Sequence, residues 1–401
     1  MDYITLYDTF YKIPDSYEKA YESRFNSPFT KHFNFNIHQY NHSRSYPAFY
    51  CYTEEIALLQ DQINREYLTG RQTYSSIPYS AILQFIKFNL INEVKSSNDI
   101  EGVRSTRKEI KSALENTAEK NRQSGIVNKY IMLVLNKSVP LKTCEEIKKL
   151  YDEMLLFEIN EDDPGNLPDG KYFRKNSVDV ITGTGKVIHR GLYPEEKIID
   201  GMNKALDILN NPQLPYLIRI ALFHYLFGYI HPFYDGNGRL DRFITAYLIA
   251  KEYGPLVGLQ VSILIKQDRK KYYSLFENTE SEINKGDLTP FIIQTLYFIR
   301  DAIHNINDVL TKKNTAYQTL LKQMHVKLKD CDQVTIRLYE LLLQASLFSD
   351  GGITINEISK ALKKTKQTIY SRLHQIPEDR LFISKNSRPF HYRLRKAWVK
   401  E

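Results

Sequence analysis

Apolar residues recur at three- and four-residue spacing over most of the chain between residues 80 and 325, and this periodicity restricts the fold more than any other feature. Such spacing is typical of helices that bury one face, so it predicts a mainly α-helical domain. The most apolar stretches, residues 215–230 and 240–253, should form its central helices. Residues 214–230 are marginal in length for a membrane span and contain Arg219 and His224, so a buried helix is expected there.

One segment interrupts the helical pattern. Polar and apolar residues alternate over Ser177, Val178, Asp179, Val180 and Ile181, a glycine-containing turn follows at 182–185, and residues 186–190 resume the alternation. This pattern predicts a β-hairpin. Because an isolated hairpin is marginally stable, we expect it to lie over another part of the domain, with an edge suited to an extended peptide.

The positive charge of the chain is concentrated at its C-terminal end. Residues 361–401 contain 11 lysines and arginines against 3 acidic residues, and this excess equals the net charge of +8 of the whole chain. Expected helices at 355–362 and 365–375, followed by a β-wing at 381–394 with a polar tip at 386–389, resemble a winged helix-turn-helix. DNA binding through residues 361–396 is one interpretation, and docking of another protein is the alternative. The residues suited to phosphate or base contacts are Lys363, Lys364, Lys366, Gln367, Thr368, Tyr370, Ser371, Arg372, Arg388, Arg393 and Arg395.

These patterns divide the chain into four expected parts. They are a helical or irregular region at 1–79, a helical domain at 80–302, a connecting helix at 303–330 and the winged helix at 331–401. Three widely separated cysteines suggest neither a disulfide framework nor a cysteine zinc site. The N-terminal residues lack the pattern of a signal peptide, so a cytoplasmic protein without membrane attachment is expected.

Most of the chemistry lies in residues 231–242, between the two central helices. Gly236, Asn237 and Gly238 form a turn whose backbone N–H groups can converge on one anion, and a helix beginning near Gly238 adds its positive end. Arg239 and Arg242 are three residues apart on one face of that helix. Two cations directed at one place predict a multiply charged ligand, such as a nucleoside triphosphate.

Two further side chains flank this turn. Asp235 immediately precedes it, and a carboxylate beside phosphates is tolerated when a hard cation bridges them, which predicts Mg²⁺. His231 ends the preceding helix, and its ordinary pKa suits a general base at neutral pH. Each of these residue types is common in a purely structural role. Their combination within so few positions predicts a nucleotide site.

The pattern His-Pro-Phe-x-Asp-Gly-Asn-Gly-Arg-x-x-Arg resembles the signature of Fic domain proteins. The resemblance covers roughly residues 80–302 and includes the hairpin, which matches the target-docking flap of the family. It implies a mainly helical Fic fold with protein adenylyltransferase activity, the transfer of AMP from ATP to a Ser, Thr or Tyr hydroxyl of a protein. The chain itself is one implied target. Transfer of another phosphate-linked group is an alternative.

The resemblance also implies roles for individual residues. His231 would deprotonate the target hydroxyl, Asp235 would hold Mg²⁺, and Phe233 would be a buried anchor. Glycine at position 238 favours AMP transfer, because kinase-type relatives have lysine there. The implied nucleotide contacts are Phe233, Gly236, Asn237, Gly238, Arg239, Arg242, Tyr272, Tyr273 and Asn284.

A second motif, Ser97-x-x-x-Glu101-Gly102, resembles the inhibitory helix of the family. This resemblance implies that a helix near residues 80–102 holds Glu101 against Arg242, in the space of the γ-phosphate. The same glutamate implies de-AMPylation as a second activity, and a homodimer is a further expectation. A different class of function is a nucleotide-sensing, DNA-binding regulator. The intact His231 and Asp235 favour catalysis, because sensing needs no base.

Overall fold

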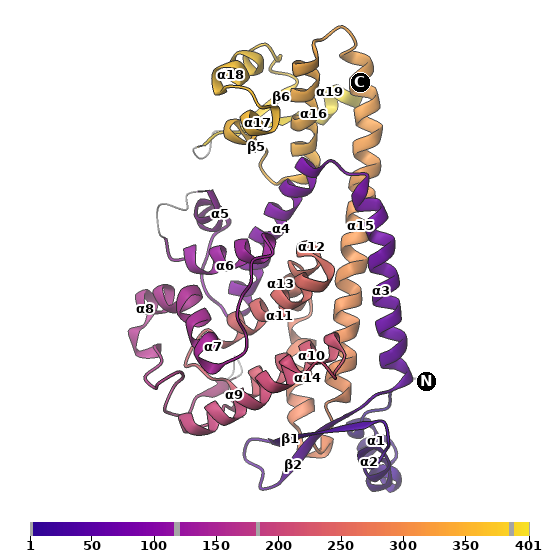
Figure 1. The fold of residues 1–401 in the computed structure, drawn as a ribbon, viewed down its shortest axis with the longest axis vertical. Helices are drawn as coiled ribbons and strands as arrows, with labels where there is room; N and C mark the ends of the chain where they lie inside the picture. The colour runs from indigo at the N-terminus through magenta and orange to yellow at the C-terminus, as the bar shows by residue number, and fades with distance from the viewer. Residues whose placement is uncertain (1–2, 116–120, 182–184, 385–388, 401) are drawn as a thin grey trace. The chain divides into compact units, whose positions relative to one another are not determined.

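The computed structural model describes residues 3–115, 121–181, 185–384 and 389–400, which form many helices and small antiparallel sheets (Figure 1). These residues group into two units. Unit 1 spans residues 1–66 and 92–302, and unit 2 spans residues 67–91 and 303–401. Three helices contribute residues to both units: α3 (Glu54–Ser75), α4 (Tyr79–Ile100) and α15 (Thr289–Lys327).

Two consecutive helices, α10 (Tyr216–Ile230) and α11 (Asn237–Tyr253), form the centre of unit 1, as the apolar spacing predicts. Most of their side chains are buried, and the two helices contact each other (Figure 1). A helix that is apolar on all sides is stable when other helices surround it. None of the helices in the described residues combines the length and hydrophobicity that a membrane crossing requires.

The other helices of unit 1 surround this pair, with α9 against α10 and α6, α12 and α13 against α11. Thr143 forms a capping box with Glu146 at the start of α7, and Asp268 caps α14. The helices are α1 (Leu6–Lys12), α2 (Tyr17–Phe25), α5 (Arg107–Glu115), α6 (Ser124–Val134), α7 (Cys144–Tyr151), α8 (Phe157–Asp162), α9 (Glu195–Asn210), α12 (Pro255–Gly258), α13 (Val261–Gln267) and α14 (Arg269–Glu280), with a π-helical turn at Asp152–Leu156 and 3-10 turns at Pro14–Ser16, Pro164–Asn166 and Glu282–Asn284.

The N-terminal residues contain a β-hairpin that was not predicted from the sequence. Strands β1 (Thr30–His38) and β2 (Ser45–Cys51) are antiparallel, with an irregularity of register between His32 and Asn36. Residues 3–66 belong to unit 1 together with the central helices.

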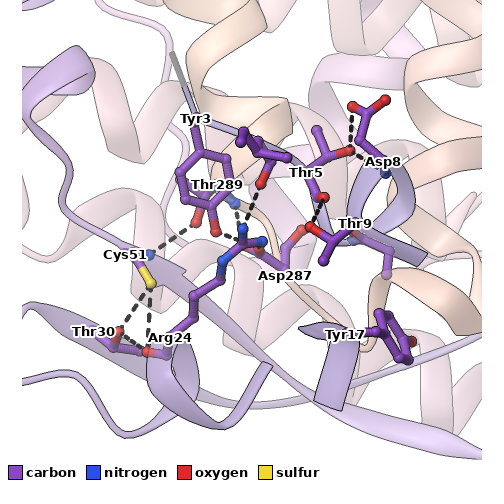
Figure 2. A network of polar contacts seen from close by, with 12 residues as sticks. Tyr3, Thr5, Asp8, Thr9, Tyr17, Arg24, Thr30, Cys51, Asp287 and Thr289 are labelled. Carbon is purple, nitrogen blue, oxygen red and sulfur yellow. Dashed lines mark hydrogen bonds and ion pairs between the residues drawn. The ribbon is translucent and has the colours of Figure 1, made fainter. Parts of the chain in front are cut away.

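A buried polar network explains this association (Figure 2). The Asp287 carboxylate, which is inaccessible to solvent, accepts hydrogen bonds from the Tyr3 hydroxyl at 2.6 Å and the Thr289 N–H at 2.9 Å. The Arg24 guanidinium lies 3.7 Å from the same carboxylate. In addition, the backbone of Phe49 in β2 bonds to Gly286 and Leu288. Burying a carboxylate requires such partners, so the N-terminal residues complete the turn before α15.

The hairpin predicted around residue 180 is present. Strands β3 (Asp179–Ile181) and β4 (Val187–Arg190) are antiparallel, and Arg190 Nε and Nη2 donate to the two carboxylate oxygens of Asp179 at 2.6 and 2.9 Å. Ser177 and Val178 precede the strand, so the paired segment is shorter than predicted. Part of the predicted turn, residues 182–184, lies outside the described residues.

Unit 2 contains the C-terminal elements α16 (Gln333–Phe348), β5 (Ile353–Thr354), α17 (Ile355–Leu362), α18 (Lys366–His374), β6 (Leu381–Ser384), β7 (His391–Leu394) and α19 (Lys396–Lys400). The strands form one antiparallel sheet in the order β5–β7–β6. The two helices and the hairpin predicted between residues 355 and 394 agree with α17, α18, β6 and β7. The predicted polar tip falls mainly on residues 385–388, outside the described residues, and Arg388 is among them.

Candidate active site

The loop between α10 and α11 depends on two left-handed backbone positions. His231 ends α10 at φ 52° and ψ 62°, and Gly236 precedes α11 at φ 81°. A side chain at position 236 would also approach Leu155 Cδ1 within 2.7 Å, so glycine is required for both conformation and space. These positions turn the chain from one central helix into the next and place the N-terminus of α11 beside His231.

Asn237 closes this loop with its side chain. Its Oδ1 accepts from the Phe233 N–H at 2.9 Å, and its Nδ2 donates to the Phe233 carbonyl at 2.7 Å. The Phe233 ring is inaccessible to solvent and stacks on Tyr151 with 3.8 Å between ring centroids. Phe233 is therefore the buried anchor predicted from the sequence. The Asn237 side chain is committed to the loop, which leaves its backbone N–H for an anion.

The imidazole of His231 is uncharged at neutral pH, which a general base requires. Burial lowers its pKa to about 4, and the nearby His189 and Arg174 act in the same direction, against opposing effects of Gly228 and Glu101. Its Nδ1 lies 3.3 Å from the Gly228 carbonyl, which favours a proton on Nδ1. The lone pair then resides on Nε2, where it can accept a proton at neutral pH.

Arg242 is bound by the end of α4, at Ser97 and Glu101. Its Nη1 donates to Glu101 Oε1 at 2.6 Å, its Nη2 to the Ser97 carbonyl at 2.9 Å and its Nε to Ser97 Oγ at 3.2 Å. Arg242 and Ser97 are almost fully buried, whereas the Glu101 side chain is 28% exposed. Burial opposes ionisation of Glu101, but Arg242 outweighs it, so the pKa of Glu101 lies below its ordinary value. The pairing of Glu101 with Arg242 inferred from the sequence is thus present.

Gly238 lies directly beneath this ion pair. A Cβ at position 238 would come within 2.0 Å of Glu101 Oε1 and 2.8 Å of Arg242 Nη1. Glycine therefore makes room for the Glu101 carboxylate in the first turn of α11. The same turn presents backbone N–H groups of the kind that bind anions, and the Glu101 carboxylate lies against it.

Arg239 has a partner that the sequence did not suggest. Its Nη1 donates to Glu158 Oε2 at 2.8 Å, and both side chains are 1% exposed. Glu158 also accepts from Arg122 Nη2 at 3.3 Å and Gln123 Nε2 at 3.2 Å. The position of Glu158 within the apolar run 154–159 was the available signal that this acid is buried. Glu158 fixes the Arg239 guanidinium near the loop.

Asp235 fits the role of a metal ligand in its exposure and its neighbours. Its side chain is 44% exposed, and one carboxylate oxygen lies 3.4 Å from Arg239 Nη2. No group of three or more potential ligands is found among His, Cys, Asp and Glu side chains in the described residues. A single carboxylate suits Mg²⁺, which retains water and takes its other ligands from phosphates.

Two neighbouring tyrosines of α14, Tyr272 and Tyr273, are among the predicted nucleotide contacts. Tyr273 is close enough to Glu101 for that carboxylate to raise its pKa, after the larger effect of burial. The Tyr272 hydroxyl lies 3.1 Å from His224 Nε2, and Tyr272 lines a cavity of about 830 Å³ that no residue of 231–242 lines. Tyr272 is also close enough to Arg242 and Glu101 to be influenced by their charges, so both tyrosines lie near the N-terminus of α11.

Asn284 also lines that cavity, and its side-chain amide donates hydrogen bonds to two backbone carbonyls. Its Nδ2 donates to the carbonyls of Thr279 at 2.9 Å and Asp287 at 2.7 Å. It is 2% exposed. Asn284 thus stabilises the turn between α14 and α15, and its contact with adenosine stays a prediction.

Two buried charged residues near the site were missed by sequence reasoning. Arg174 contacts the His231 backbone, and Glu93 precedes Ser97 by one helical turn on α4. The Glu93 carboxylate accepts from the Ser262 N–H at 2.8 Å and the Ile263 N–H at 3.2 Å, at the start of α13. Glu93, Ser97 and Glu101 therefore follow one face of α4. No local pattern distinguishes Glu93 from an ordinary helix acid.

Comparison with known proteins agrees with this geometry. Residues 142–249 match the family model described as Fic/DOC family. The chain is 30% identical over 164 residues to protein adenylyltransferase Fic of Drosophila melanogaster, which covers 41% of this chain and 29% of that protein. The corresponding Drosophila virilis protein is 40% identical over 72 residues, 18% of this chain and 13% of that protein. This chain thus covers less than a third of the fly proteins it matches.

A similar fold occurs in a solved structure. The crystal structure of a Fic family protein from Desulfovibrio desulfuricans G20 superposes with a TM-score of 0.50 and 19% identity, over 86% of this chain and 96% of that one. An identity this low shows similarity of fold alone. The loop at 231–242 lies within the residues that match the Fic/DOC family model.

Proposed function

We propose that this Fic domain is a protein adenylyltransferase that transfers AMP from ATP to a hydroxyl side chain of a protein and is restrained by Glu101. The observation that carries the proposal is the engagement of Arg242 by Ser97 and Glu101 directly above Gly238. A buried arginine at a helix N-terminus is suited to binding an anion, and in this protein the Glu101 carboxylate is the anion that it binds. The adenylyltransferase named among the fly relatives supports the choice of reaction.

In the proposed reaction, Nε2 of His231 accepts the proton of the target hydroxyl. The hydroxyl oxygen forms a bond to the α-phosphorus, and the bond from that phosphorus to the bridging oxygen of pyrophosphate breaks. The low pKa of His231, about 4, keeps the imidazole neutral so that it can accept this proton. The N–H groups of residues 236–238 and the guanidinium of Arg239 would stabilise charge on the phosphates.

Mg²⁺ would be held by Asp235 and would neutralise charge on the α- and β-phosphates when bound. The residues around Asp235 position its carboxylate for this purpose: Gly236 allows the left-handed turn after it, and Arg239 lies on the side away from solvent. Chelation of Mg²⁺ should therefore abolish transfer.

The restraint follows from competition for Arg242. While Glu101 accepts from Nη1, a γ-phosphate cannot use that donor, and its negative charge is repelled by the carboxylate. ATP bound under these conditions would be displaced, and a displacement of about 1 Å can reduce a rate about 10²-fold. Removal of AMP by a water molecule that Glu101 orients is a second activity of the same geometry, supported by the 28% exposure of its side chain.

The test uses ATP labelled at the α-phosphate and compares wild type, Glu101→Gly and His231→Ala, with a cell lysate as the source of targets. We expect incorporation of label in Glu101→Gly to exceed that of wild type strongly, and none in a double variant that also carries His231→Ala. Mass spectrometry should find an AMP adduct on a hydroxyl side chain. Equal labelling of wild type and Glu101→Gly would exclude the restraint, and labelling without His231 would exclude the assigned base.

A second candidate function, DNA binding, concerns unit 2. We infer a winged helix-turn-helix from α17, α18 and the β6–β7 hairpin, with α18 as the recognition helix. Tyr370 of α18 is 48% exposed. Arg372 is paired with Asp332, and Arg393 stacks on Phe382, so these two are partly withdrawn from a nucleic-acid partner. Binding to duplex DNA at two salt concentrations tests this function. Binding that is strong at low salt and weak at high salt is expected, and no binding at low salt would favour protein docking.

A further inference from the structure

We infer that Arg174 is a positioning residue that fixes the base, His231, and the β3–β4 hairpin as one rigid unit. The inference rests on the proposed function, because it assigns Arg174 a part in the same reaction. The hydrogen bonds that Arg174 makes with the loop go to the backbone of His231 and Pro232, not to the turn at residues 236–238 or to Nε2 of His231, the nitrogen that would accept the proton. Arg174 would therefore act through the backbone at the end of α10.

The first observation is a buried arginine without an acidic partner. Arg174 is inaccessible to solvent, and in the described part of the chain no carboxylate forms an ion pair with it. Desolvation accordingly lowers its pKa to about 10. A buried charge without a counter-ion destabilises a fold unless hydrogen bonds compensate for the lost hydration. The hydrogen bonds of Arg174 therefore indicate its role.

The second observation is where those hydrogen bonds go. Arg174 Nε and Nη2 both donate to the His231 carbonyl, at 3.0 and 2.8 Å, and its backbone N–H donates to the Pro232 carbonyl at 3.2 Å. His231 has the left-handed conformation that non-glycine residues rarely adopt. As the residue that caps the C-terminus of α10, it also lacks a helical partner for its carbonyl. Arg174 supplies that partner and holds the conformation that aims the imidazole.

The third observation connects this contact to the hairpin. Arg174 Nη1 donates to the carbonyl of Asn176, just before β3. Gly191, just after β4, lies against the guanidinium, and a Cβ there would meet Arg174 Nη2 at 2.3 Å and His231 Cβ at 2.9 Å. Leu192 N–H completes the contact by donating to the Ile230 carbonyl at 3.1 Å. Both ends of the hairpin are therefore fixed to the residue that would act as base.

Because Arg174 contacts both ends of the β3–β4 hairpin, the hairpin would position a docked target relative to His231. A target chain docked on the hairpin edge would have its hydroxyl placed relative to β3 and β4. Because Arg174 fixes the same strands to His231, it would set the distance between that hydroxyl and Nε2. Its positive charge acts with burial and His189, and against Glu101, in keeping His231 neutral.

The experiment compares Arg174→Gln, Arg174→Lys and Gly191→Ala, each in the Glu101→Gly background. Lysine keeps the charge but cannot place two donors on one carbonyl, and the Gly191 change displaces the guanidinium without removing it. Arg219→Gln is the matched control, because Arg219 also donates to a backbone carbonyl, that of Leu209, away from the loop. Thermal unfolding confirms that each variant folds.

We expect label incorporation from ATP to fall about 10²-fold in all three variants, as kcat rather than KM for ATP, with unchanged affinity for Mg²⁺–ATP in calorimetry. Titration of the His231 ring by NMR, assigned with His231→Ala, separates charge from geometry. The pKa of His231 should rise in Arg174→Gln, although burial and His189 still hold it below its ordinary value, and should not rise in Arg174→Lys.

Rates in Arg174→Gln and Gly191→Ala equal to that of the Glu101→Gly parent, or a loss equal to that of Arg219→Gln, would overturn the positioning role. The NMR titration tests Arg174 even if the Glu101→Gly protein transfers no AMP. An absent reaction with a raised His231 pKa in Arg174→Gln would overturn the proposed function and leave the contact of Arg174 with His231 standing.

Discussion

Replacing Glu101 with glutamine changes one oxygen and removes one charge, while it keeps the shape of the side chain above Gly238. Arg242 would retain its two hydrogen bonds to Ser97 and lose the charge-assisted bond to Glu101 Oε1, which measures 2.6 Å. A hydrogen bond to a charged group contributes about 1.5–3 kcal/mol. The Glu101 side chain is 28% exposed, so solvent reduces the value toward the lower end of this range.

This loss shifts the competition between Glu101 and a phosphate for Arg242. At about 1.4 kcal/mol for each factor of ten, the lower end of this range corresponds to a shift of roughly 10-fold in favour of the phosphate. We expect an increase of this order in the rate of label incorporation from ATP at low ATP concentration. Glu101→Gly should give at least the same increase, because it also removes the bulk of the side chain and the oxygen through which a glutamine could still accept from Arg242.

The assay measures initial rates over a range of ATP concentrations, with calorimetry for ATP affinity. Asp99→Asn is the matched control, since Asp99 lies on the same helix end, carries the same charge and pairs with Lys95 and Lys266 instead of Arg242. An increase of the same size in Asp99→Asn would assign the effect to net charge. Unchanged rates and affinities in both Glu101 variants would refute the competition for Arg242.

Three further outcomes are expected. Asn237→Ala should lower the free energy of unfolding by about 2–3 kcal/mol, because two buried hydrogen bonds to the Phe233 backbone are lost, and thermal melting together with the rate of transfer would reveal it. The transfer rate of Glu101→Gly should stay level from pH 8 down to about pH 5, because burial lowers the pKa of His231 to about 4, and a rate that halves near pH 6.5 would contradict this. Burial raises the pKa of Glu93 to about 7, so between about pH 5 and 7 the native state binds more protons than the unfolded state, and stability should fall as the pH rises. Glu93→Gln should flatten this dependence, as melting temperatures at pH 5 and pH 8 would show.

The parts of the site that the sequence predicts are those encoded by neighbouring residues. The apolar spacing locates α10 and α11, and the glycines at 236 and 238 indicate a tight turn before a helix. The spacing of Ser97 and Glu101 places both on one face of α4, because four residues are close to one helical turn. In each case the relevant interaction lies within one turn or one loop.

The parts that escaped prediction depend on contacts between distant residues. Glu158 and Arg239 are 81 positions apart, and Arg174 and His231 are 57 apart. Neither pair has a local pattern that would identify its partner. The β1–β2 hairpin was also missed, although polar and apolar residues alternate over residues 32–38 of β1. The hydrogen bonds of Asn284 to the carbonyls of Thr279 and Asp287 also have no sequence signal, and its predicted contact with adenosine stays a prediction.

The contacts of Arg242 with α4 have a reciprocal consequence. If displacement of Glu101 strengthens nucleotide binding by a given factor, thermodynamic linkage requires that bound nucleotide weaken the attachment of the α4 end by the same factor. Backbone amides in the last turn of α4 should then exchange their hydrogens faster when ATP is bound. Any ligand or partner that destabilises the last turn of α4 would activate the enzyme. The nucleotide would be a weak activator, because part of its own binding free energy is used to displace Glu101.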